Sequence, residues 1–577
     1  MQPRQETVVV TGSFEPLELE EVDRAVRQYK VRDWALVSNT IADFLQLDPS
    51  VDLRQRAPNG MQGDLSIRGG SFGQTLVLID GQRVNDAQSG HHNLDLPLPL
   101  ESIDRVEILR GAGSTLYGAD ATGGVVNVIT ARPESSEMRL RTAVGNFGVN
   151  QQRGWLSFAR GAVAQSLAFS RDFSSGFQTN RDYRNLSLAS RTALTSPLGP
   201  TDITLAYADR PFGAEQFYGN FNSWEDTRTW LASARQALGH KTQASFTYRR
   251  HTDLFVLYRD RPQVFTNRHA SESFLGALRR TETLGTNVKL FYGAEGVHES
   301  IASNNLGQHS RARGAGYASL DVRALRRFSF SIGAREEVYG SLASQFSPSV
   351  SAGVWLSPHW KVRGGVSRAF RVPTYTDLYY QDPGNRGSPD LRPETAWSYE
   401  GGLDWNAGGR VRAEATVFQR RERDGIDYIR RSAADIWRAA NIHQLHFTGL
   451  ETGVSIRAAR AQQIELRYTG LRGVQSALSD LQSKYVFNYP VHTGIASWMA
   501  SLPGDITMRT RIGAMERRAR DPYAVWDLYF ARGGSRVRPF VQFTNLTDTR
   551  YQQILGVPMP GRAVVGGLEL VVFGRTR

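Results

Sequence analysis

Residues 67–130 decide how this chain folds, and they contain four short blocks. The blocks read IRGG at 67–70, LVLIDG at 76–81, RVEILRG at 105–111 and LYGADATGGVVNVIT at 116–130. The apolar runs 76–79 and 125–129 have strand length, and the glycines beside them suit turns that need a positive φ. Arg68 and Arg110 each precede a turn glycine and have hydrophobic neighbours. Because a buried guanidinium without a partner is costly, we expect this segment to sit inside a structure that supplies negative charge.

In their residues and in their order along the chain, these blocks resemble the plug domain of TonB-dependent outer-membrane receptors. Later blocks are similar to the family's mid-barrel region and final hairpin: FRVPT at 370–374, DLYY at 377–380, PDLRPET at 389–395, NLTDTRY at 545–551 and PMPGR at 558–562. The resemblance implies an all-β dominated membrane protein, a 22-strand antiparallel transmembrane β-barrel with a small N-terminal α+β plug in its lumen. The implied function is TonB-dependent transport of a scarce large ligand across the outer membrane of a Gram-negative-type bacterium, without enzymatic activity.

The composition is compatible with such a barrel but does not require it. A chain of 577 residues exceeds one ordinary globular core, so two or more domains are expected. No run of 18 apolar residues predicts a membrane helix, but barrel strands alternate and form no such run. The absence of cysteine excludes disulfides and thiolate metal sites. The first residues, MQPRQET, show no apolar segment of a signal peptide.

The net charge of +13 comes almost entirely from arginine, since lysine occurs only at 30, 241, 289, 361 and 484. A nucleic-acid-binding protein would show a clustered basic patch with interleaved aromatic residues. Here the arginines are scattered along the chain. We therefore expect no nucleic-acid partner, and we place the arginines in a polar lumen and in loops near anionic lipid.

After Arg132 and Pro133 the residue pattern changes to alternating segments of strand length. This change predicts a domain boundary near residue 133. The expected parts are an N-terminal segment at 1–12, a plug at 13–133 and a barrel at 134–577. Beyond the boundary, apolar residues alternate with polar or small ones at 203–208, 328–333 and, less regularly, 411–418. Lipid outside and water inside a barrel require this alternation. A soluble β-sandwich would alternate too, so periodicity leaves both open.

The first 50 residues contain an exposed-strand candidate and two helix candidates. A β-branched run such as ETVVVTG at 6–12 can add to the edge of a partner's sheet. In the receptor family a similar run is the box that TonB grips, and the resemblance gives this role to Glu6, Thr7, Val8, Val9 and Val10. The alternative is the first strand of the plug. Helical spacing predicts one helix from Leu17 to Val31 and a second beginning at Asn39 or Thr40, with Ile41, Phe44 and Leu45 on one face.

Two acidic residues of the barrel half are candidate partners for the plug arginines. Glu400 in SYEGG and Glu451 in GLETG resemble the barrel acids that face the plug in this family. We therefore expect a charge cluster of Arg68, Arg110, Glu400 and Glu451 that seats the plug.

Ligand contacts are expected from two polar and aromatic stretches. In the family, the loop after LIDG rises to the extracellular side and touches the ligand. The candidates are Ser71, Phe72, Gln74, His91, His92 and Asn93, together with Phe217, Tyr218 and Trp224 of segment 211–226. Neighbouring His91 and His92 point opposite ways in an extended segment, so they are not expected to bind one metal, and they could instead fix the loop to the barrel wall. Glu225 and Asp226 are calcium candidates, although two adjacent acids fall short of a calcium motif. No cofactor and no other metal are expected.

The resemblance leaves the cargo open. The sequence blocks of the plug are most similar to those of the cobalamin-transporter-like branch, which makes a cobalamin-like ligand the first candidate. A ferric siderophore is the alternative cargo within the same fold. Haem is less favoured because no histidine lies between Phe370 and Leu391. The implied partners are TonB with its inner-membrane energising complex, outer-membrane lipid and the ligand, with the receptor as a monomer.

Two alternatives belong to other classes. A β-structured hydrolase could use Ser71, since 69–73 fits G-x-S-x-G. The strand predicted at 74–79 follows this serine, where a nucleophile elbow requires a helix. A soluble β-adhesin is the other alternative.

Overall fold

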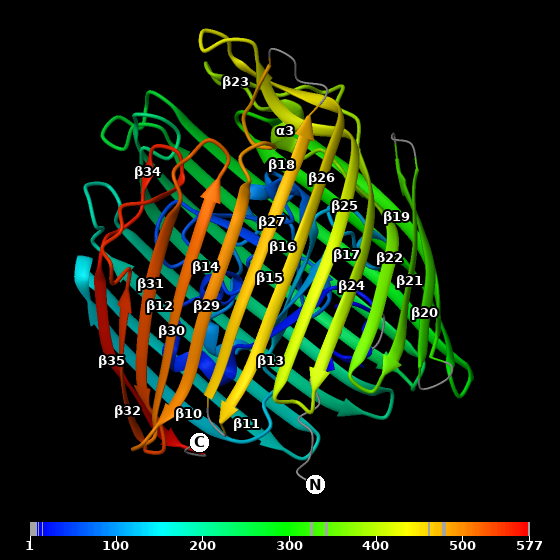
Figure 1. The fold of residues 1–577 in the computed structure, drawn as a ribbon. Coiled ribbons are helices and arrows are strands. Elements are labelled where there is room, and N and C mark those ends of the chain that lie inside the picture. The colour runs from blue at the N-terminus through cyan, green and yellow to red at the C-terminus, as the bar shows by residue number, and fades with distance from the viewer. Residues whose placement is uncertain are drawn as a thin grey trace.

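The protein folds into a closed β-barrel with a separate small sheet in its lumen (Figure 1). The computed structural model describes residues 8–9, 11–13, 16–323, 327–340, 344–459, 462–475 and 481–574. Within these ranges the barrel has 22 long antiparallel strands, and pairing of the first with the last closes it. The strands are β10 (Glu137–Gly145), β11 (Val149–Arg160), β12 (Val163–Ser174), β13 (Tyr183–Ser196), β14 (Gly199–Glu215), β15 (Asn222–Leu238), β16 (Thr242–Val256), β17 (Thr266–Gly285), β18 (Val288–Ser303), β19 (Gly307–Val322), β20 (Phe328–Tyr339), β21 (Gln345–Ser357), β22 (Trp360–Arg371), β24 (Glu394–Ala407), β25 (Val411–Arg430), β26 (Trp437–Ala459), β27 (Gln462–Gln475), β29 (Pro490–Leu502), β30 (Ile506–Arg517), β31 (Tyr523–Arg532), β32 (Val537–Thr544) and β35 (Ala563–Phe573).

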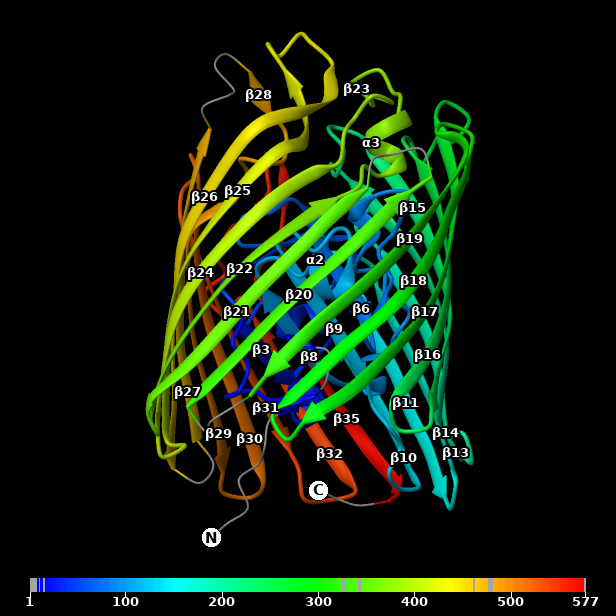
Figure 2. The same cartoon turned by 90° about the vertical axis from the view of Figure 1, so that its right-hand side faces the viewer.

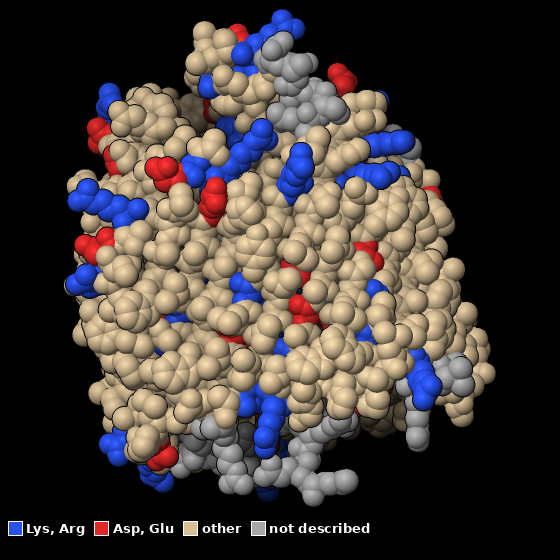
Figure 3. Space-filling view, in the orientation of Figure 1, with Lys and Arg blue, Asp and Glu red and all other residues tan. Residues whose placement is uncertain are grey.

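Side chains along each barrel strand alternate between the lumen and the outer surface. On β14, Leu205 is 54% exposed while its neighbour Ala206 is buried. On β25, Val417 is 58% exposed between buried Thr416 and Phe418. Figure 3 shows few charged residues across the middle of the outer face, with Lys and Arg gathered toward the two rims. A barrel presents such a surface to lipid. In the described part of the chain, no helix has the length and apolar character needed to cross a bilayer.

The two ends of the barrel differ in the length of their connections. At the end where β10 begins and β35 ends, two-residue links such as 161–162 join consecutive strands. At the other end, longer segments carry short elements, of which Figure 2 labels the first three and Figure 1 labels β34: α3 (Tyr375–Tyr379), β23 (Asn385–Arg386), β28 (Gln482–Ser483), β33 (Gln552–Ile554) and β34 (Val557–Pro558). We refer to these as the short-turn end and the long-loop end. The 3₁₀ turn η5 (Asn146–Gly148) connects β10 to β11.

The plug is built on a five-stranded sheet inside the barrel (Figure 2). Its order is β3 (Val26–Lys30), β8 (Ile103–Arg110), β9 (Gly124–Thr130), β6 (Thr75–Ile79) and β7 (Gln82–Arg83). Two further pairs are β4 (Val51–Gln55) with β5 (Gly63–Ile67), and β1 (Val8–Val9) with β2 (Leu17–Glu18). Its helices are η1 (Arg32–Val37), α1 (Ile41–Leu45), η2 (Phe72–Gln74), η3 (Gly90–His92), η4 (Leu100–Ser102) and α2 (Ser114–Tyr117). The central strands are apolar on both faces, as expected for a covered sheet, and their Val77, Ile108 and Val126 are fully buried.

The prediction of a helix from Leu17 to Val31 is wrong, whereas the second predicted helix is present. The first segment forms β2, a turn and β3, whose Val26 pairs with Leu109 of β8. Val22 and Val26 are still buried together, so the apolar spacing marked burial correctly but not the backbone conformation. The second helix, α1, starts after Thr40, and the Asp43 side chain accepts hydrogen bonds from the main-chain nitrogens of Asn39 at 2.6 Å and Thr40 at 3.2 Å.

Candidate functional site

Two plug arginines and two barrel glutamates form a buried charge cluster. Arg68 binds Glu451 through two bonds, Nε to Oε1 at 2.7 Å and Nη2 to Oε2 at 2.8 Å, and its Nη1 binds Glu400 Oε2 at 2.8 Å. Arg110 Nη1 lies 3.1 Å from Glu451 Oε2. None of the four side chains is more than 6% exposed. The structure therefore brings together the four residues expected from the sequence, at bonding distances that desolvation strengthens.

The cluster also contains members that the sequence did not indicate. Arg24 Nε lies 3.0 Å from Glu400 Oε1, Arg27 contacts Glu414, and Arg110 Nη2 lies 3.4 Å from Glu414 Oε1. Arg24 and Arg27 lie in the segment expected to be a helix, which hid their position beside β8. Glu414 lies in the barrel stretch with the least regular alternation. Predicting an edge strand at residues 26–30 would have placed Arg24 and Arg27 near Arg110.

Ser71 and Gln74 lie in a second contact between plug and barrel. Gln74 is buried and its Nε2 donates to Glu394 Oε2 at 2.7 Å and to Glu422 Oε2 at 3.2 Å. Arg371 Nη2 pairs with the same Glu394 at 3.0 Å. The main-chain nitrogen of Ser71 donates to Gln74 Oε1 at 2.9 Å. Ser71 precedes the single turn η2 and then strand β6, so the strand–serine–helix context of a hydrolase is missing here.

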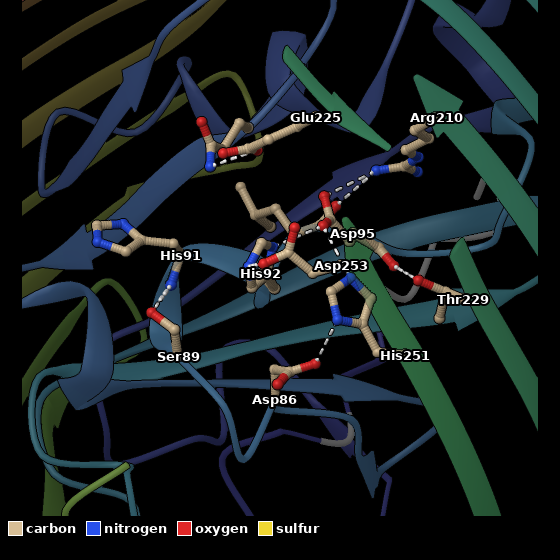
Figure 4. Close-up of polar contacts among 12 residues, drawn as sticks. Asp86, Ser89, His91, His92, Asp95, Arg210, Glu225, Thr229, His251 and Asp253 are labelled. Atoms are coloured by element: carbon tan, nitrogen blue, oxygen red, sulfur yellow. Dashed lines mark hydrogen bonds and ion pairs between the residues drawn. The ribbon is translucent and has the colours of Figure 1, made fainter. Parts of the chain in front are cut away.

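His91 and His92 point in opposite directions (Figure 4). His91 Nδ1 lies 2.5 Å from Asp64 Oδ1, and its ring stacks on Phe72 with centroids 4.1 Å apart. Burial lowers the pKa of His91 despite the nearby Asp64. Asn93 fastens the same loop, since its side chain donates to the Phe72 carbonyl at 3.3 Å.

His92 turns toward the barrel wall and lies between carboxylates. Its Nδ1 is 3.1 Å from Asp95 Oδ2, and its Nε2 is 3.5 Å from Asp253 Oδ2 on β16. Burial alone would lower the pKa of His92, but these two carboxylates raise it well above its ordinary value. His251, also on β16, completes the group with its Nε2 3.3 Å from Asp95 Oδ2. His251 could not be found from the sequence, because no local motif surrounds it and about 160 residues separate it from His92.

Aromatic rings and cationic groups gather at the long-loop end above the plug. Tyr485 meets the plug's Phe72 edge-on, with centroids 5.1 Å apart. Lys484 Nζ lies 5.3 Å from the Tyr485 ring, 5.5 Å from Tyr428 and 5.9 Å from Trp437. Across the same end, rings of His309 and Tyr379 stack at 3.7 Å. We refer to Phe72, Tyr428, Trp437, Lys484 and Tyr485 as the aromatic mouth.

The segment with Phe217, Tyr218 and Trp224 is only partly directed into the lumen. Phe217 is buried beneath Arg181, and the Tyr218 hydroxyl bonds to Glu225. Trp224 lies on the outer face of β15, because its neighbours on both sides in the chain are the buried ones.

The structure separates the two calcium candidates. Glu225 faces the plug, where Gln62 Nε2 donates to it at 3.0 Å, whereas Asp226 lies on the opposite face of β15 and pairs with Arg228 at 2.8 Å. Successive residues of a strand point to opposite faces, so this pair of carboxylates does not converge on one cation.

The expected TonB-gripped run falls only partly within the described residues. Val8 and Val9 form β1, which pairs with Leu17 and Glu18 of β2. Glu6, Thr7 and Val10 lie outside the described residues.

A cavity of about 530 Å³ lies between the plug and the barrel wall toward the short-turn end. Arg191, Arg235 and Arg279 project into it from the barrel, and Arg83 and Asp80 border it from the plug. The charged barrel residues that line this cavity are these three arginines and Glu295, and Arg191 and Arg235 both pair with Asp202.

The amino-acid sequence matches the models of two protein families. The description "TonB dependent receptor-like, beta-barrel" matches residues 142–551, and "TonB-dependent Receptor Plug Domain" matches residues 19–125. The chain belongs to the TonB-dependent receptors.

Relatives and solved structures agree with this assignment. The chain is 28% identical over 483 residues to an iron-regulated outer membrane virulence protein of Vibrio cholerae, covering 74% of this chain and 72% of the relative. It is 23% identical over 406 residues to the vitamin B12 transporter BtuB of Photobacterium profundum, covering 65% and 64%. The crystal structure of the siderophore receptor PirA from Acinetobacter baumannii shares the fold, with a TM-score of 0.79 at 15% identity over 95% of this chain and 98% of that one.

Family membership establishes the general activity and location. The protein is a TonB-dependent receptor and transporter of the bacterial outer membrane, not an enzyme. Bacterial barrels have short periplasmic turns and longer extracellular loops, so the short-turn end faces the periplasm and the long-loop end faces the medium.

Proposed function

We propose that the cargo is a ferric siderophore whose iron-binding groups are anionic and aromatic. The carrying observation is the aromatic mouth, where the Lys484 ammonium lies within 6 Å of three rings above the plug. A cation bordered by aromatic faces can pair with an anionic group while the rings stack on its aromatic part.

Three further observations support an anionic iron complex. Arg430 lies over the Trp437 ring at 4.2 Å, which adds a second cation beside the mouth. Arg279, which lines the cavity at the periplasmic side, adds a guanidinium group further along the barrel, whereas Arg191 and Arg235 there pair with Asp202. The Vibrio cholerae relative is described as iron-regulated. Cobalamin is the second candidate for the cargo. It is favoured by the amino-acid sequence of the plug blocks and by the vitamin B12 transporter among the relatives.

We further propose the division of the chain for transport. Residues 6–10 would be the segment that TonB grips, residues 13–133 the plug and residues 134–577 the barrel, acting as a monomer. Strand β9 ends at Thr130 and β10 begins at Glu137, which is compatible with a boundary near residue 133. The cluster of Arg68, Arg110, Glu400 and Glu451 would hold the plug until TonB acts.

Binding by the detergent-solubilised receptor tests the cargo. Cobalamin, a ferric catecholate, a ferric hydroxamate and haem are titrated separately while tryptophan fluorescence is recorded, since Trp437 lies in the mouth. We expect saturable binding of the ferric catecholate. Lys484→Ala should weaken it at least tenfold, which corresponds to about 1.4 kcal/mol and lies within the range of desolvated cation–π contacts.

Lys241→Ala is the matched control, because Lys241 lies at the periplasmic end and pairs with Glu282 at 2.6 Å. Its affinity for every ligand should equal that of the unchanged receptor. Tight cobalamin binding without siderophore binding would replace the proposed cargo, and equal affinities of the Lys484→Ala and unchanged receptors would remove the mouth from the binding site.

A further inference from the structure

A buried histidine–aspartate cluster joins the plug to the barrel, apart from the aromatic mouth and the glutamate–arginine cluster. His92 and Asp95 come from plug loop 84–96, and His251 comes from β16 (Figure 4). One ligand atom of each residue lies within 4.8 Å of those of the other two. Their exposed fractions are 4%, 5% and 0%. These are residue types that bind metals, and they are held together out of contact with solvent.

The two distances from Asp95 to the histidines fit tetrahedral coordination. Asp95 Oδ2 lies 3.1 Å from His92 Nδ1 and 3.3 Å from His251 Nε2. When nitrogen and oxygen ligands lie at 2.0–2.1 Å from a tetrahedral zinc ion, neighbouring ligand atoms are about 3.3 Å apart. Two of the three ligand–ligand distances therefore already match a tetrahedral site, and the third, between the two histidine nitrogens, is at most 4.8 Å.

His251 is fully buried between two carboxylates, one at each ring nitrogen. Its Nδ1 lies 3.0 Å from Asp86 Oδ2 and its Nε2 faces Asp95. An imidazole nitrogen is a preferred ligand of borderline transition metals.

The charges around the cluster favour a cation. Asp86 pairs with Arg249 at 2.5 Å and Asp95 with Arg210 at 3.3 Å, but Asp253 has no guanidinium partner among the described residues. With neutral imidazoles, three carboxylates and two guanidinium groups leave a net charge of −1. This buried negative charge attracts a cation: a proton on His92 would bring the sum to zero, and a divalent ion beside neutral imidazoles would bring it to +1.

The surroundings also match the outer shell of a histidine metal site. Asp253 faces the Nε2 of His92 and Asp86 faces the Nδ1 of His251, in each case the nitrogen opposite the one turned to Asp95. A carboxylate on the second ring nitrogen orients a ligating histidine and raises its basicity. A proton on His92 is the competing occupant, and metal binding would displace it.

We propose that His92, Asp95 and His251 bind one divalent transition-metal ion of the zinc type, which fastens plug loop 84–96 to strand β16. Two nitrogens and one oxygen from the protein leave a fourth position for water. The ion would hold the plug loop in its resting position and is distinct from the transported cargo.

The test uses untagged receptor in detergent, treated with EDTA and then freed of it. Zinc chloride is titrated by calorimetry, and bound zinc is counted by plasma mass spectrometry. We expect one zinc per chain. His251→Gln and Asp95→Asn should each weaken binding more than about 100-fold, since loss of a residue that only hydrogen-bonds to a metal ligand already costs about 10–100-fold. Cobalt(II) in place of zinc should give the visible absorption of a tetrahedral site.

His91→Ala is the matched control, because His91 is adjacent in sequence but contacts Asp64 instead. It should retain one zinc. Circular dichroism and heat-dependent gel mobility check that each variant is folded. Absence of saturable zinc binding and of a tetrahedral cobalt spectrum in the unchanged receptor would overturn the proposal, as would full zinc binding by folded His251→Gln.

Discussion

Replacing both Glu400 and Glu451 by glutamine is expected to loosen the plug strongly while the barrel remains folded. Arg68 would lose both of its carboxylate partners and Arg110 would lose Glu451, with all of these side chains buried. Removing one partner of a buried ion pair destabilises by about 3–5 kcal/mol, because the remaining charge stays desolvated. The two substitutions share Arg68, so their effects should not simply add.

Loosening of the plug can be measured with a single introduced thiol, because the chain has no native cysteine. Ser114 is a buried plug residue whose hydroxyl contacts the barrel at the Phe370 main-chain nitrogen. In a Ser114→Cys background, the rate of thiol labelling reports how often the plug opens. A loss of about 3 kcal/mol raises that rate roughly 100-fold when opening and closing are fast.

Glu282→Gln provides the control, because Glu282 pairs with Lys241 on the surface. Exposed pairs contribute little, so labelling should stay at the unchanged rate. If the double substitution also left labelling and ion leakage through the barrel unchanged, the cluster would have no part in seating the plug.

Deleting residues 6–10 is expected to abolish transport while ligand binding is retained. The aromatic mouth lies at the extracellular end, whereas residues 20–23 contact the periplasmic ends of barrel strands: Lys361 Nζ, near the start of β22, binds the carbonyl oxygens of Glu20 and Val22, each at 3.0 Å. Uptake of radioactive ferric siderophore by cells should fall to the level of cells without TonB. Equilibrium binding to the purified receptor should not change.

Val8→Pro and Val8→Thr sharpen the test without shortening the chain. Proline removes a main-chain donor and is excluded from the interior of a ladder, so it should block uptake if TonB pairs with this segment as a strand. Threonine keeps the β-branched shape and should transport normally. Undiminished uptake by the proline variant and the deletion would end the assignment of residues 6–10.

The sequence predicted the fold well because local patterns and long-range order agreed. Alternation at residues 203–208 predicted the exposed face of β14, and Thr40 predicted the start of α1. The segment from Leu17 to Val31 was misread because its apolar residues satisfy helical spacing, whereas its pairing with β8 depends on residues about 80 positions away. A short segment cannot reveal such a partner.

The site could be predicted only where single residues carried enough information. Arg68 and Glu451 were identified because each lies in a family-like block, whereas Glu414 and His251 lie on ordinary barrel strands. Which strand faces which plug loop depends on the register of the whole barrel. Trp224 and Asp226 illustrate the same limit, since a shift of one residue along a strand moves a side chain from the lumen to the outside.

The position of β3 at the edge of the plug sheet determines how the receptor can respond to mechanical force. Pulling on residues 8–18 first loads the hydrogen bonds that tie Thr11 to Glu107 of β8 and to Asn127 of β9. Once these side-chain bonds break, the force acts on β3, which pairs with β8 at the end of the sheet order. This ladder can therefore separate while β8, β9 and β6 stay together. Arg24 and Arg27 would leave their glutamates with it, and Arg68 would keep Glu451. We expect the work of opening to depend on one short ladder and its ion pairs, so that a passage can form by partial extension of the plug without extraction of the whole domain.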